Sequence, residues 1–355
     1  MKKVAIVGTQ GVPANYGGFE SLVENMIGEN CSPDIQYTVF CSSKDMKEEI
    51  PSYKGAYLKY VPLHANGVQS IPYDIVSMMR VIKGYDVILI LGVSGCIFLP
   101  ILKMLSRKRI VVNIDGLEHR RDKWGKAAKW FLRFSERVAV KWADTIIADN
   151  KGIQDYVMET YAKKAEMIAY GGDHALRNIA QEKQTEVLNN YGLTKNGYAV
   201  SVCRIEPENN CHVSLEAFSK TDKPFVFIGN WQRSEYGREL KEKYARCKNI
   251  KMLDPIYDLD TLYVLRSNAR YYIHGHSAGG TNPSLVEAMF FGCPIIAYNV
   301  VYNRETTENK AYYFNNSDDI VALLQRNDLM GEVMKDIAIN QYTWKKIAKQ
   351  YEALY

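Results

Sequence analysis

Short apolar runs alternate with longer amphipathic stretches along the first half of the chain. Continuous apolar runs predict strands in the middle of a parallel sheet. Such runs occur at residues 4–8, 37–41, 57–61, 87–91, 110–114 and 145–148. Stretches with helical spacing separate most of them, at residues 21–27, 73–83, 97–105 and 126–142. This alternation predicts a doubly wound parallel sheet.

The alternation stops near residues 171–173, where a polar segment, residues 177–190, follows. It then starts afresh, with strands predicted at residues 199–203, 225–229, 250–253, 271–274 and 294–298. We therefore expect two similar α/β domains, residues 1–175 and 190–340. The last stretch, residues 343–355, has helical spacing, and one face carries Trp344, Ile347, Ala348, Tyr351 and Leu354. A terminal amphipathic helix of this kind needs a surface to cover.

A glycine loop links a strand to a helix in the second domain. After strand 271–274 come two glycines, two residues that favour helix caps, and Pro283 at the predicted first helical position. Backbone N–H groups at such a junction are unpaired and partly positive, so they suit a phosphate; a merely tight turn is the alternative. Glu287 follows one turn into the helix, where it can accept a hydrogen bond from a sugar hydroxyl. The loop residues are Gly279, Gly280, Thr281 and Asn282.

A second glycine loop, residues 9–20, follows the first strand and contains Gly17 and Gly18. Its spacing differs from the G-x-G-x-x-G of dinucleotide sites, and it lacks the Gly-Lys-Ser/Thr of a P-loop. Open α/β sheets bind ligands at the carboxyl ends of their strands. Because both glycine loops lie there, a ligand in a cleft between the two domains would touch both.

Arg204 ends the first strand of the second domain. A guanidinium at that position can meet a phosphate with charge-assisted hydrogen bonds. A surface salt bridge to Glu206 or Glu208 is the alternative.

Asp115 and Glu118 follow strand 110–114 and also face the expected cleft. Two carboxylates beside the imidazole of His119 can provide an acid, a base or an orienting group, whereas a capped loop leading to the next helix is the alternative. A D-x-D string at residues 258–260 has the form of a metal-binding motif. A helical stretch follows it, so an N-cap at Asp258 and a first-turn acid explain it better, and we expect no metal site.

The composition is that of a soluble protein with more than one core: 355 residues, 47% hydrophobic and 24% charged. No apolar run approaches the roughly 18 residues of a membrane span. The apolar run after Lys2 and Lys3 is too short for a signal-peptide core, so we expect a cytoplasmic protein. Seven scattered cysteines without a CxxC pair favour reduced thiols over disulfides or a zinc site.

Positive charge is concentrated in residues 101–141, where twelve Lys or Arg face four Asp or Glu. That segment has a net charge of +8 in a chain whose total is +5. Such clustering indicates an anionic partner: a membrane surface, a phosphorylated lipid or a nucleic acid. Trp130, Phe131 and Phe134 lie among these cations, a mixture that suits a membrane interface. Ordinary core packing of the rings is the alternative.

Four stretches taken together resemble a known family: residues 7–20, 114–118, 204–210 and 275–288. In the same order they are similar to stretches of the retaining GT-B glycosyltransferases (family 4-like), and more closely of a bacterial polysaccharide rhamnosyltransferase subfamily. The resemblance implies an α/β fold with two Rossmann-like, doubly wound parallel-sheet domains facing a cleft. It also implies that domain 1–175 binds the acceptor, that domain 190–340 binds the nucleotide sugar, and that helix 343–355 packs back on the first domain.

The resemblance assigns roles to single residues. Glu287 matches the second of two family glutamates and would hold the ribose, while Gly279 stands at the first, so the N–H groups of Gly280, Thr281 and Asn282 would replace that donor contact. Arg204 and Asn209 stand where relatives place an arginine and a lysine on the diphosphate. Because one cation is missing here, Gly17 and Gly18 would stabilise more of the negative charge of the diphosphate. Asp115 falls where many relatives have a histidine near the C6 hydroxyl, a group that a 6-deoxy sugar such as rhamnose lacks.

The implied function is metal-independent and cofactor-free transfer of a sugar, L-rhamnose from dTDP-rhamnose, to a lipid-diphosphate-linked saccharide in cell-surface polysaccharide (capsule) synthesis. Asp115, Glu118 and Arg204 would be catalytic. Segment 101–141 would touch the inner face of the cell membrane peripherally, and no nucleic-acid partner is expected. The alternatives are a UDP- or GDP-sugar donor, an NAD-dependent oxidoreductase, and a non-catalytic two-lobed saccharide-binding protein.

Overall fold

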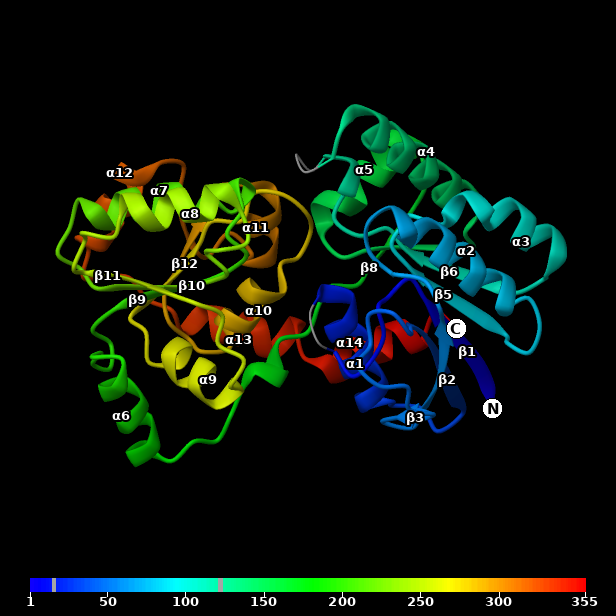
Figure 1. Ribbon diagram of the computed structural model, residues 1–355, viewed down its shortest axis with the longest axis horizontal. Helices are drawn as coiled ribbons and strands as arrows, with labels where there is room; N and C mark the ends of the chain where they lie inside the picture. The colour runs from blue at the N-terminus through cyan, green and yellow to red at the C-terminus, as the bar shows by residue number, and fades with distance from the viewer. Residues whose placement is uncertain (15–16, 121–123) are drawn as a thin grey trace. The chain divides into compact units, whose positions relative to one another are not determined.

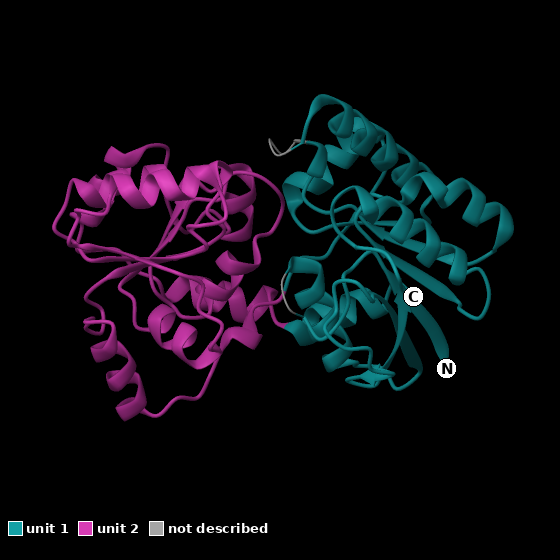
Figure 2. Cartoon of the chain, viewed as in Figure 1, with its two compact units in different colours: residues 1–170, 344–355 teal, residues 171–343 magenta. Residues whose placement is uncertain are grey.

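The computed structural model describes residues 1–14, 17–120 and 124–355. These residues form two compact units (Figure 2). Unit 1 comprises Met1–Tyr170 and Trp344–Tyr355, and unit 2 comprises Gly171–Thr343. The last helix therefore belongs to the first unit, although the whole of unit 2 precedes it along the chain (Figure 1).

Unit 1 contains, among its described residues, an eight-stranded sheet with the order β3-β4-β2-β1-β5-β6-β7-β8. Neighbouring strands are parallel except for β3 and β4. The strands are β1 (Lys2–Val7), β2 (Ile35–Ser42), β3 (Ser52–Tyr53), β4 (Ala56–Val61), β5 (Val87–Leu91), β6 (Arg109–Asn113), β7 (Thr145–Ala148) and β8 (Glu166–Met167). The helices are α1 (Gly18–Glu29), α2 (Ser70–Arg80), α3 (Leu99–Leu105), α4 (Lys126–Trp142), α5 (Lys151–Tyr161) and α14 (Trp344–Glu352), with 3-10 turns η1 (Gly67–Gln69), η2 (Cys96–Phe98) and η3 (Glu118–Arg120).

Unit 2 contains a six-stranded, wholly parallel sheet with the order β11-β10-β9-β12-β13-β14. The strands are β9 (Ala199–Val202), β10 (Phe225–Ile228), β11 (Ile250–Leu253), β12 (Tyr271–His274), β13 (Ile295–Tyr298) and β14 (Tyr312–Phe314). The helices are α6 (Gln181–Asn190), α7 (Cys211–Ser219), α8 (Glu235–Lys243), α9 (Leu259–Ser267), α10 (Pro283–Met289), α11 (Val301–Thr306), α12 (Ser317–Leu324) and α13 (Glu332–Gln341), with 3-10 turns η4 (Asp173–Ala175) and η5 (Pro207–Asn209). Both sheets have the predicted doubly wound character.

Burial explains why the central strands read as continuous apolar runs. Residues 4–7 of β1 and all of β5 are buried, as expected for strands covered on both faces. Helix α14 adds Trp344, Ile347 and Tyr351 to the same core, against α1. Each such side chain stabilises the fold by about 1.5–3 kcal/mol when fully buried. The prediction that the C-terminal helix covers the first domain is confirmed.

Several short elements were missed by the sequence pattern. Strands β3 and β8 have two residues each and lie at the two edges of their sheet, so neither presents a periodic run. Strand β14 has three residues. The polar segment 177–190 contains helix α6, which buries Leu188 as its sole fully buried residue and therefore shows no apolar stripe. In the described part of the chain, no helix is long and apolar enough to cross a membrane.

Candidate active site

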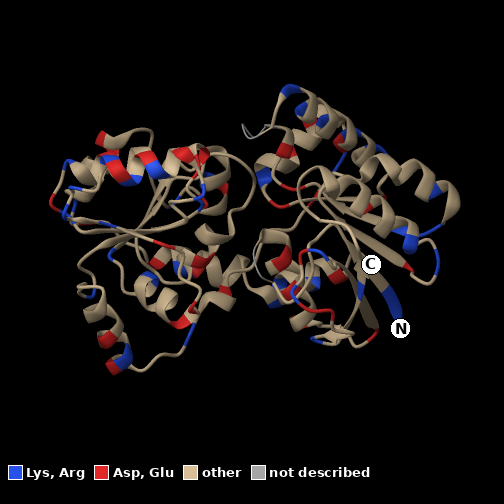
Figure 3. Ribbon diagram, viewed as in Figure 1, with Lys and Arg blue, Asp and Glu red and all other residues tan. Residues whose placement is uncertain are grey.

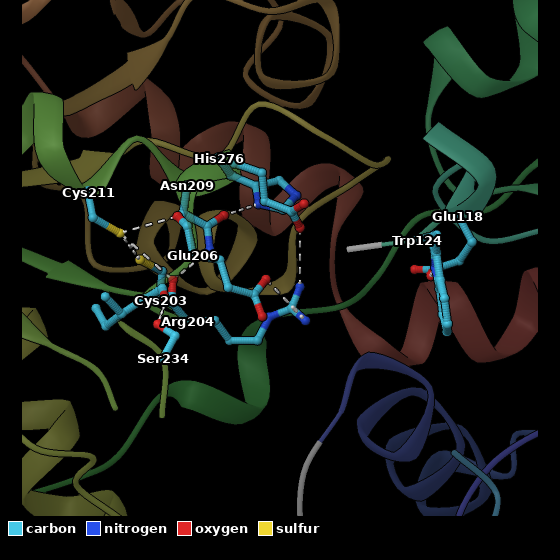
Figure 4. Close-up of polar contacts among 11 residues, drawn as sticks. Glu118, Trp124, Cys203, Arg204, Glu206, Asn209, Cys211, Ser234 and His276 are labelled. Atoms are coloured by element: carbon cyan, nitrogen blue, oxygen red, sulfur yellow. Dashed lines mark hydrogen bonds and ion pairs between the residues drawn. The ribbon is translucent and has the colours of Figure 1, made fainter. Parts of the chain in front are cut away.

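Two loops of unit 2 are tied together at the carboxyl ends of the neighbouring strands β9 and β12. The Asn209 side chain donates from Nδ2 to the Arg204 carbonyl at 2.7 Å, and its Oδ1 lies 2.5 Å from Nδ1 of His276 (Figure 4). A Cβ at Gly275 would lie 2.1 Å from the Asn209 carbonyl oxygen, so only glycine fits there. Asn209 thus joins the loops through its amide, and its predicted contact with a diphosphate stays a prediction.

Helix α10 begins as the sequence predicts. The Asn282 side chain accepts a hydrogen bond from the Ser284 N–H at 3.0 Å, and Pro283 is the first helical residue. Gly279 has a φ of +101°, a conformation that glycine adopts at little cost. Gly280 and Thr281 are buried in the loop between them. Because Asn282 occupies one N–H group at this helix end, fewer remain for a phosphate than a bare glycine loop would offer.

Arg204 lies between two carboxylates. Its Nη1 is 3.7 Å from Glu206 Oε2, and its Nη2 is 4.0 Å from Glu208 Oε1. The salt bridges offered as the alternative are therefore present, but both distances are longer than those of strong charge-assisted hydrogen bonds. The side chain is 35% exposed and carries five N–H donors, so it retains the capacity to meet an anion. Its phosphate role stays a prediction.

Glu287 is held by two basic side chains within unit 2. Its Oε2 lies 2.6 Å from Arg266 Nη1, and its Oε1 lies 3.4 Å from His174 Nε2. Burial alone would raise the pKa of Glu287, but the Arg266 charge and the His174 contact outweigh it and lower that pKa to about 2. The carboxylate, with its side chain 19% exposed, is therefore ionised at neutral pH and able to accept further hydrogen bonds.

Arg266 and His174 are residues that the sequence analysis missed. Arg266 is 3% exposed, donates from Nη2 to the Ser284 carbonyl at 3.2 Å, and has its guanidinium 5.0 Å from the Phe291 ring centroid. It lies in the last turn of α9, where a basic residue ordinarily serves the helix end. His174 lies in η4, within the last three residues of the predicted first domain, residues 1–175. No short-range pattern marks either residue as a partner of Glu287.

Glu20 fixes the glycine loop of unit 1. Its Oε1 accepts hydrogen bonds from Thr9 Oγ1 at 3.0 Å and from the Gln10 N–H at 2.8 Å, and burial raises the pKa of this carboxyl group. A Cβ at Gly17, whose φ is +122°, would lie 1.9 Å from Glu20 Oε2. A diphosphate at Gly17 and Gly18 would share the start of α1 with this carboxyl group. Residues 15–16 of the predicted loop lie outside the described residues.

Asp115 lies just past the carboxyl end of β6 in a strained loop. Its φ is +61° and that of Leu117 is +57°, a region that costs non-glycine residues about 1–3 kcal/mol each. The Asp115 N–H donates to Asn113 Oδ1 at 3.0 Å. Strain of this kind persists where the surrounding structure enforces it, and it clusters at functional sites.

Glu118 begins η3, and its Oε2 accepts a hydrogen bond from Trp124 Nε1 at 3.0 Å. The adjacent His119 has its Nδ1 3.1 Å from Oε2 of Glu136, a carboxylate that is 1% exposed. The two residues of the predicted acid or base pair thus follow β6, while His119 is tied to α4. Residues 121–123, part of the same predicted loop, lie outside the described residues.

Two further residues of unit 1 belong with this group. Tyr170 is buried, and burial, together with the charges of Asp115 and Asp149, raises its pKa well above the ordinary value. Asp149 is 3% exposed and follows β7 directly. Carboxyl groups and a phenol thus gather at the edge of the sheet where ligands bind. Asp149 and Asn150 come straight after the strand predicted at residues 145–148, a local pattern that places polar groups at the carboxyl end of that strand.

Of the three rings of α4 named above, Phe131 is half-buried and the other two are exposed. Trp130 is 71% exposed and Phe134 is 47% exposed, and their rings stack with centroids 5.9 Å apart. Core packing is therefore wrong for these two residues, and the predicted contact with a membrane stays a prediction.

The D-x-D string has structural roles. The Asp258 carboxylate accepts a hydrogen bond from the Thr261 N–H at 3.0 Å, which confirms the predicted cap of α9. Asp260 pairs with Lys183 at 3.1 Å. Over residues 1–14, 17–120 and 124–355, no cluster of three or more His, Cys, Asp or Glu is arranged to hold a metal ion.

Solved structures of the same architecture define the class of fold. Sucrose-phosphate synthase from Thermosynechococcus elongatus matches with a TM-score of 0.82 at 15% identity, over 100% of this chain and 98% of that one. HepE from Anabaena, solved with UDP, matches with a TM-score of 0.78 at 14% identity, over 99% of both chains. Starch synthase IV from Arabidopsis thaliana, bound to ADP and acarbose, matches with a TM-score of 0.75 at 13% identity, over 100% and 98%. The fold is GT-B, as predicted.

Two family models match the sequence. Residues 183–340 match the family described as glycosyl transferases group 1, and residues 1–173 match a domain of unknown function, DUF1972. No curated protein matches the chain. The GT-B fold and the match over most of unit 2 make this protein a glycosyltransferase, which confirms the predicted enzyme class.

Proposed function

We propose that the protein is a retaining, metal-independent glycosyltransferase that moves L-rhamnose from dTDP-rhamnose to a lipid-diphosphate-linked saccharide. The product serves cell-surface polysaccharide synthesis, such as that of a capsule. The observation that carries the proposal is Glu287, a carboxylate kept ionised by Arg266 one turn behind a glycine loop. An ionised carboxylate at that position suits a hydroxyl of the nucleotide sugar ring, which in dTDP is the single 3′-hydroxyl of the deoxyribose and donates one hydrogen bond.

Unit 2 binds the donor in this scheme. Glu287 accepts a hydrogen bond from the deoxyribose 3′-hydroxyl. The N–H groups of Gly280, Thr281 and Asn282 face the transferred sugar in place of the acidic side chain that Gly279 lacks. HepE has been solved with UDP and with UDP-glucose, which supports a nucleoside-diphosphate sugar as the class of donor. Asp115, at the position where many relatives have a histidine for the C6 hydroxyl, favours a 6-deoxy sugar.

The leaving diphosphate is stabilised by Arg204, with Asn209 supporting its loop and with Gly17 and Gly18 at the start of α1. A preorganised donor of this kind contributes about 10²–10³ in rate when it contacts the charge that develops in the transition state. The 35% exposure of Arg204 and its two long ion pairs leave it able to turn towards the diphosphate.

The chemistry follows a front-face course. The acceptor hydroxyl oxygen forms a bond to the anomeric carbon on the face from which the diphosphate leaves. The bond between that carbon and the phosphate oxygen breaks, its electron pair stays with the diphosphate, and the diphosphate oxygen takes the acceptor proton. Asp115 and Glu118 orient the acceptor hydroxyl and do not attack the sugar. No cofactor takes part.

Unit 1 binds the acceptor, and the protein acts from the cytoplasm at the inner face of the membrane. The net charge of +8 over residues 101–141 supports peripheral contact with an anionic bilayer. A lipid-linked acceptor lies at that surface, so such contact brings enzyme and acceptor together. Nucleic acid has no part in this scheme.

A panel of nucleotide sugars tests the donor. The purified protein is incubated with membrane extract and radiolabelled dTDP-rhamnose, UDP-glucose or GDP-mannose, and label is followed into the lipid fraction. Transfer from dTDP-rhamnose is expected. Transfer from a UDP- or GDP-sugar instead, the alternative that HepE favours, refutes the rhamnose donor and keeps the enzyme class. Absence of turnover with every donor, together with binding of free saccharide, points to the non-catalytic two-lobed protein.

A further inference from the structure

A basic pocket lies where α3 ends and β6 begins in unit 1. It is a shallow depression of about 400 Å³, largely open to solvent, and is lined by four cations and one carboxylate. Arg109 begins β6 and Thr145 begins β7, so the pocket lies at the amino ends of these parallel strands. The loop that carries Asp115 leaves β6 at the opposite end. The pocket is therefore separate from the candidate active site. Its lining residues are Lys103, Arg107, Lys108, Arg109 and Asp144.

Charge in this pocket is not balanced. Asp144 Oδ2 accepts hydrogen bonds from Lys103 Nζ at 2.5 Å and from the Ile110 N–H at 2.7 Å, so Lys103 and the backbone use the carboxylate. Arg109 makes a long contact, 3.4 Å, to the neutral Thr145 hydroxyl. Within the described ranges, the other three cations, at positions 107, 108 and 109, form no ion pair. Three uncompensated cations around one hollow attract a phosphate group.

Apolar side chains stand exposed beside the pocket. Met104 is 83% exposed and Leu105 is 59% exposed, in the last turn of α3, which one residue, Ser106, separates from Arg107. Helix α4 packs against α3, and its first half carries the exposed, stacked rings of Trp130 and Phe134, whereas its last residues lead to Asp144 of the pocket. Figure 3 shows basic residues along α4 as well. Exposed apolar side chains of this size next to cations are the signature of a helix that lies in a membrane interface.

We infer that this pocket binds the phosphate of an anionic lipid headgroup while Met104 and Leu105 enter the acyl boundary beside it. The inference deepens the proposed function, on whose membrane location it rests. A lipid fits better than free phosphate because a soluble anion gives no reason for two large apolar side chains at the rim of its site. In one bilayer, the headgroup phosphate contacts the cations and the acyl chains contact the apolar side chains.

Vesicle binding tests the inference on the full chain. Sedimentation is measured with phosphatidylcholine vesicles, with and without phosphatidylglycerol. One variant carries Arg107→Ala, Lys108→Ala and Arg109→Ala; a second carries Met104→Ser and Leu105→Ser. The matched control replaces three exposed cations of unit 2 with alanine, at Lys223, Arg246 and Lys248.

We expect binding that requires phosphatidylglycerol, a loss of about fivefold for each pocket cation removed, a clear loss for the apolar variant, and wild-type binding for the control. Equal losses of vesicle binding in the control and pocket variants refute a specific lipid site, because net charge alone then explains the binding. A second result also overturns the inference and assigns the pocket to free phosphate. It is that inorganic phosphate raises the melting temperature of the wild type in a thermal-shift assay, while Met104→Ser and Leu105→Ser have no effect on vesicle binding.

The donor panel reports on the proposed function independently. Hydrolysis of the nucleotide sugar in the absence of vesicles should be the same for the wild type and the pocket variant, because the pocket lies away from Asp115 at the other end of β6. Loss of that hydrolysis in the pocket variant shows that the pocket serves the reaction and refutes a separate lipid site.

Discussion

Replacing Arg266 with methionine should destabilise unit 2 by leaving the Glu287 charge unpaired. Methionine has a similar length but no charge, so the change removes the ion pair with Glu287 together with the hydrogen bond to the Ser284 carbonyl and the contact of the guanidinium with the Phe291 ring. Glu287 moves from its ordinary pKa of 4.5 to about 2 in the folded protein. At about 1.4 kcal/mol for each pKa unit, that shift corresponds to roughly 3 kcal/mol of stabilisation. Breaking a buried ion pair by removing one partner costs about 3–5 kcal/mol, which agrees.

The sign of the pH dependence follows from the lowered pKa of Glu287. A carboxylate whose folded pKa lies below its unfolded value contributes its full stabilisation above about pH 4.5 and loses it as the pH falls towards 2. In the variant, burial without Arg266 raises the pKa of Glu287, so the carboxyl group takes up its proton at milder pH and escapes the cost of a buried charge. The difference in free energy of unfolding between wild type and variant is therefore largest at neutral pH and becomes smaller as the pH falls.

Urea unfolding followed by tryptophan fluorescence measures this difference in free energy, because Trp231 is buried in unit 2. The free energy of unfolding is compared at pH 7.5 and pH 5 for the wild type and for Arg266→Met. Arg270→Met is the control, because Arg270 is exposed. Adding Glu287→Gln to Arg266→Met should recover part of the loss by removing the stranded charge. A loss no larger than that of the control, or one that is equal at both pH values, refutes the role assigned to Arg266.

Three more outcomes are expected. Arg204→Ala should lower the rate of sugar transfer by about 10²–10³, whereas Asp258→Ala should leave the rate unchanged and lower the stability only slightly through loss of its helix cap. An inactive Asp258 variant whose activity manganese restores would refute the metal-independent scheme. Gly275→Ala should force the β12 loop away from Asn209, since the new Cβ would lie 2.1 Å from a carbonyl oxygen. Thermal unfolding should then show a lower melting temperature and a smaller rise of that temperature when nucleotide is added. Glu136→Gln should cost about 1.5–3 kcal/mol at neutral pH, because burial is outweighed by hydrogen bonds from His119, Tyr161 and Tyr156 and the pKa of this carboxyl group is lowered; the loss should shrink below about pH 4.5 in urea unfolding, and a pH-independent loss would contradict the assignment.

Much of the fold was predictable because its central strands are buried on both faces. The predicted strands 87–91, 145–148 and 271–274 match β5, β7 and β12 at both ends. The strand predicted at 250–253 also matches β11, although β11 lies at an edge of its sheet and is only partly buried. The caps of α9 and α10 were also predictable, since a cap depends on residues within one turn. The edge strand β8 was not, because two residues carry no period.

The site was predictable only where its residues lie in one loop. Glu287 and Arg204 could be named from local motifs, but their partners could not. Arg266 reaches Glu287 from another helix and His174 reaches it from η4, so both contacts depend on the tertiary fold. The same limit applies to Asn209, whose amide joins two loops and faces a neighbour that no local spacing reveals.

Asn113 connects the last helix of the chain to the loop that holds Asp115. Its Nδ2 donates to the Tyr351 hydroxyl at 2.9 Å, and its Oδ1 accepts from the Asp115 N–H at 3.0 Å. Tyr351 orients the asparagine, and the asparagine holds Asp115 in its left-handed conformation, which is costly without such support. The strained loop therefore depends on α14, which follows unit 2 in the sequence. The return of the chain to unit 1 thus helps to hold the candidate acceptor loop in its native geometry.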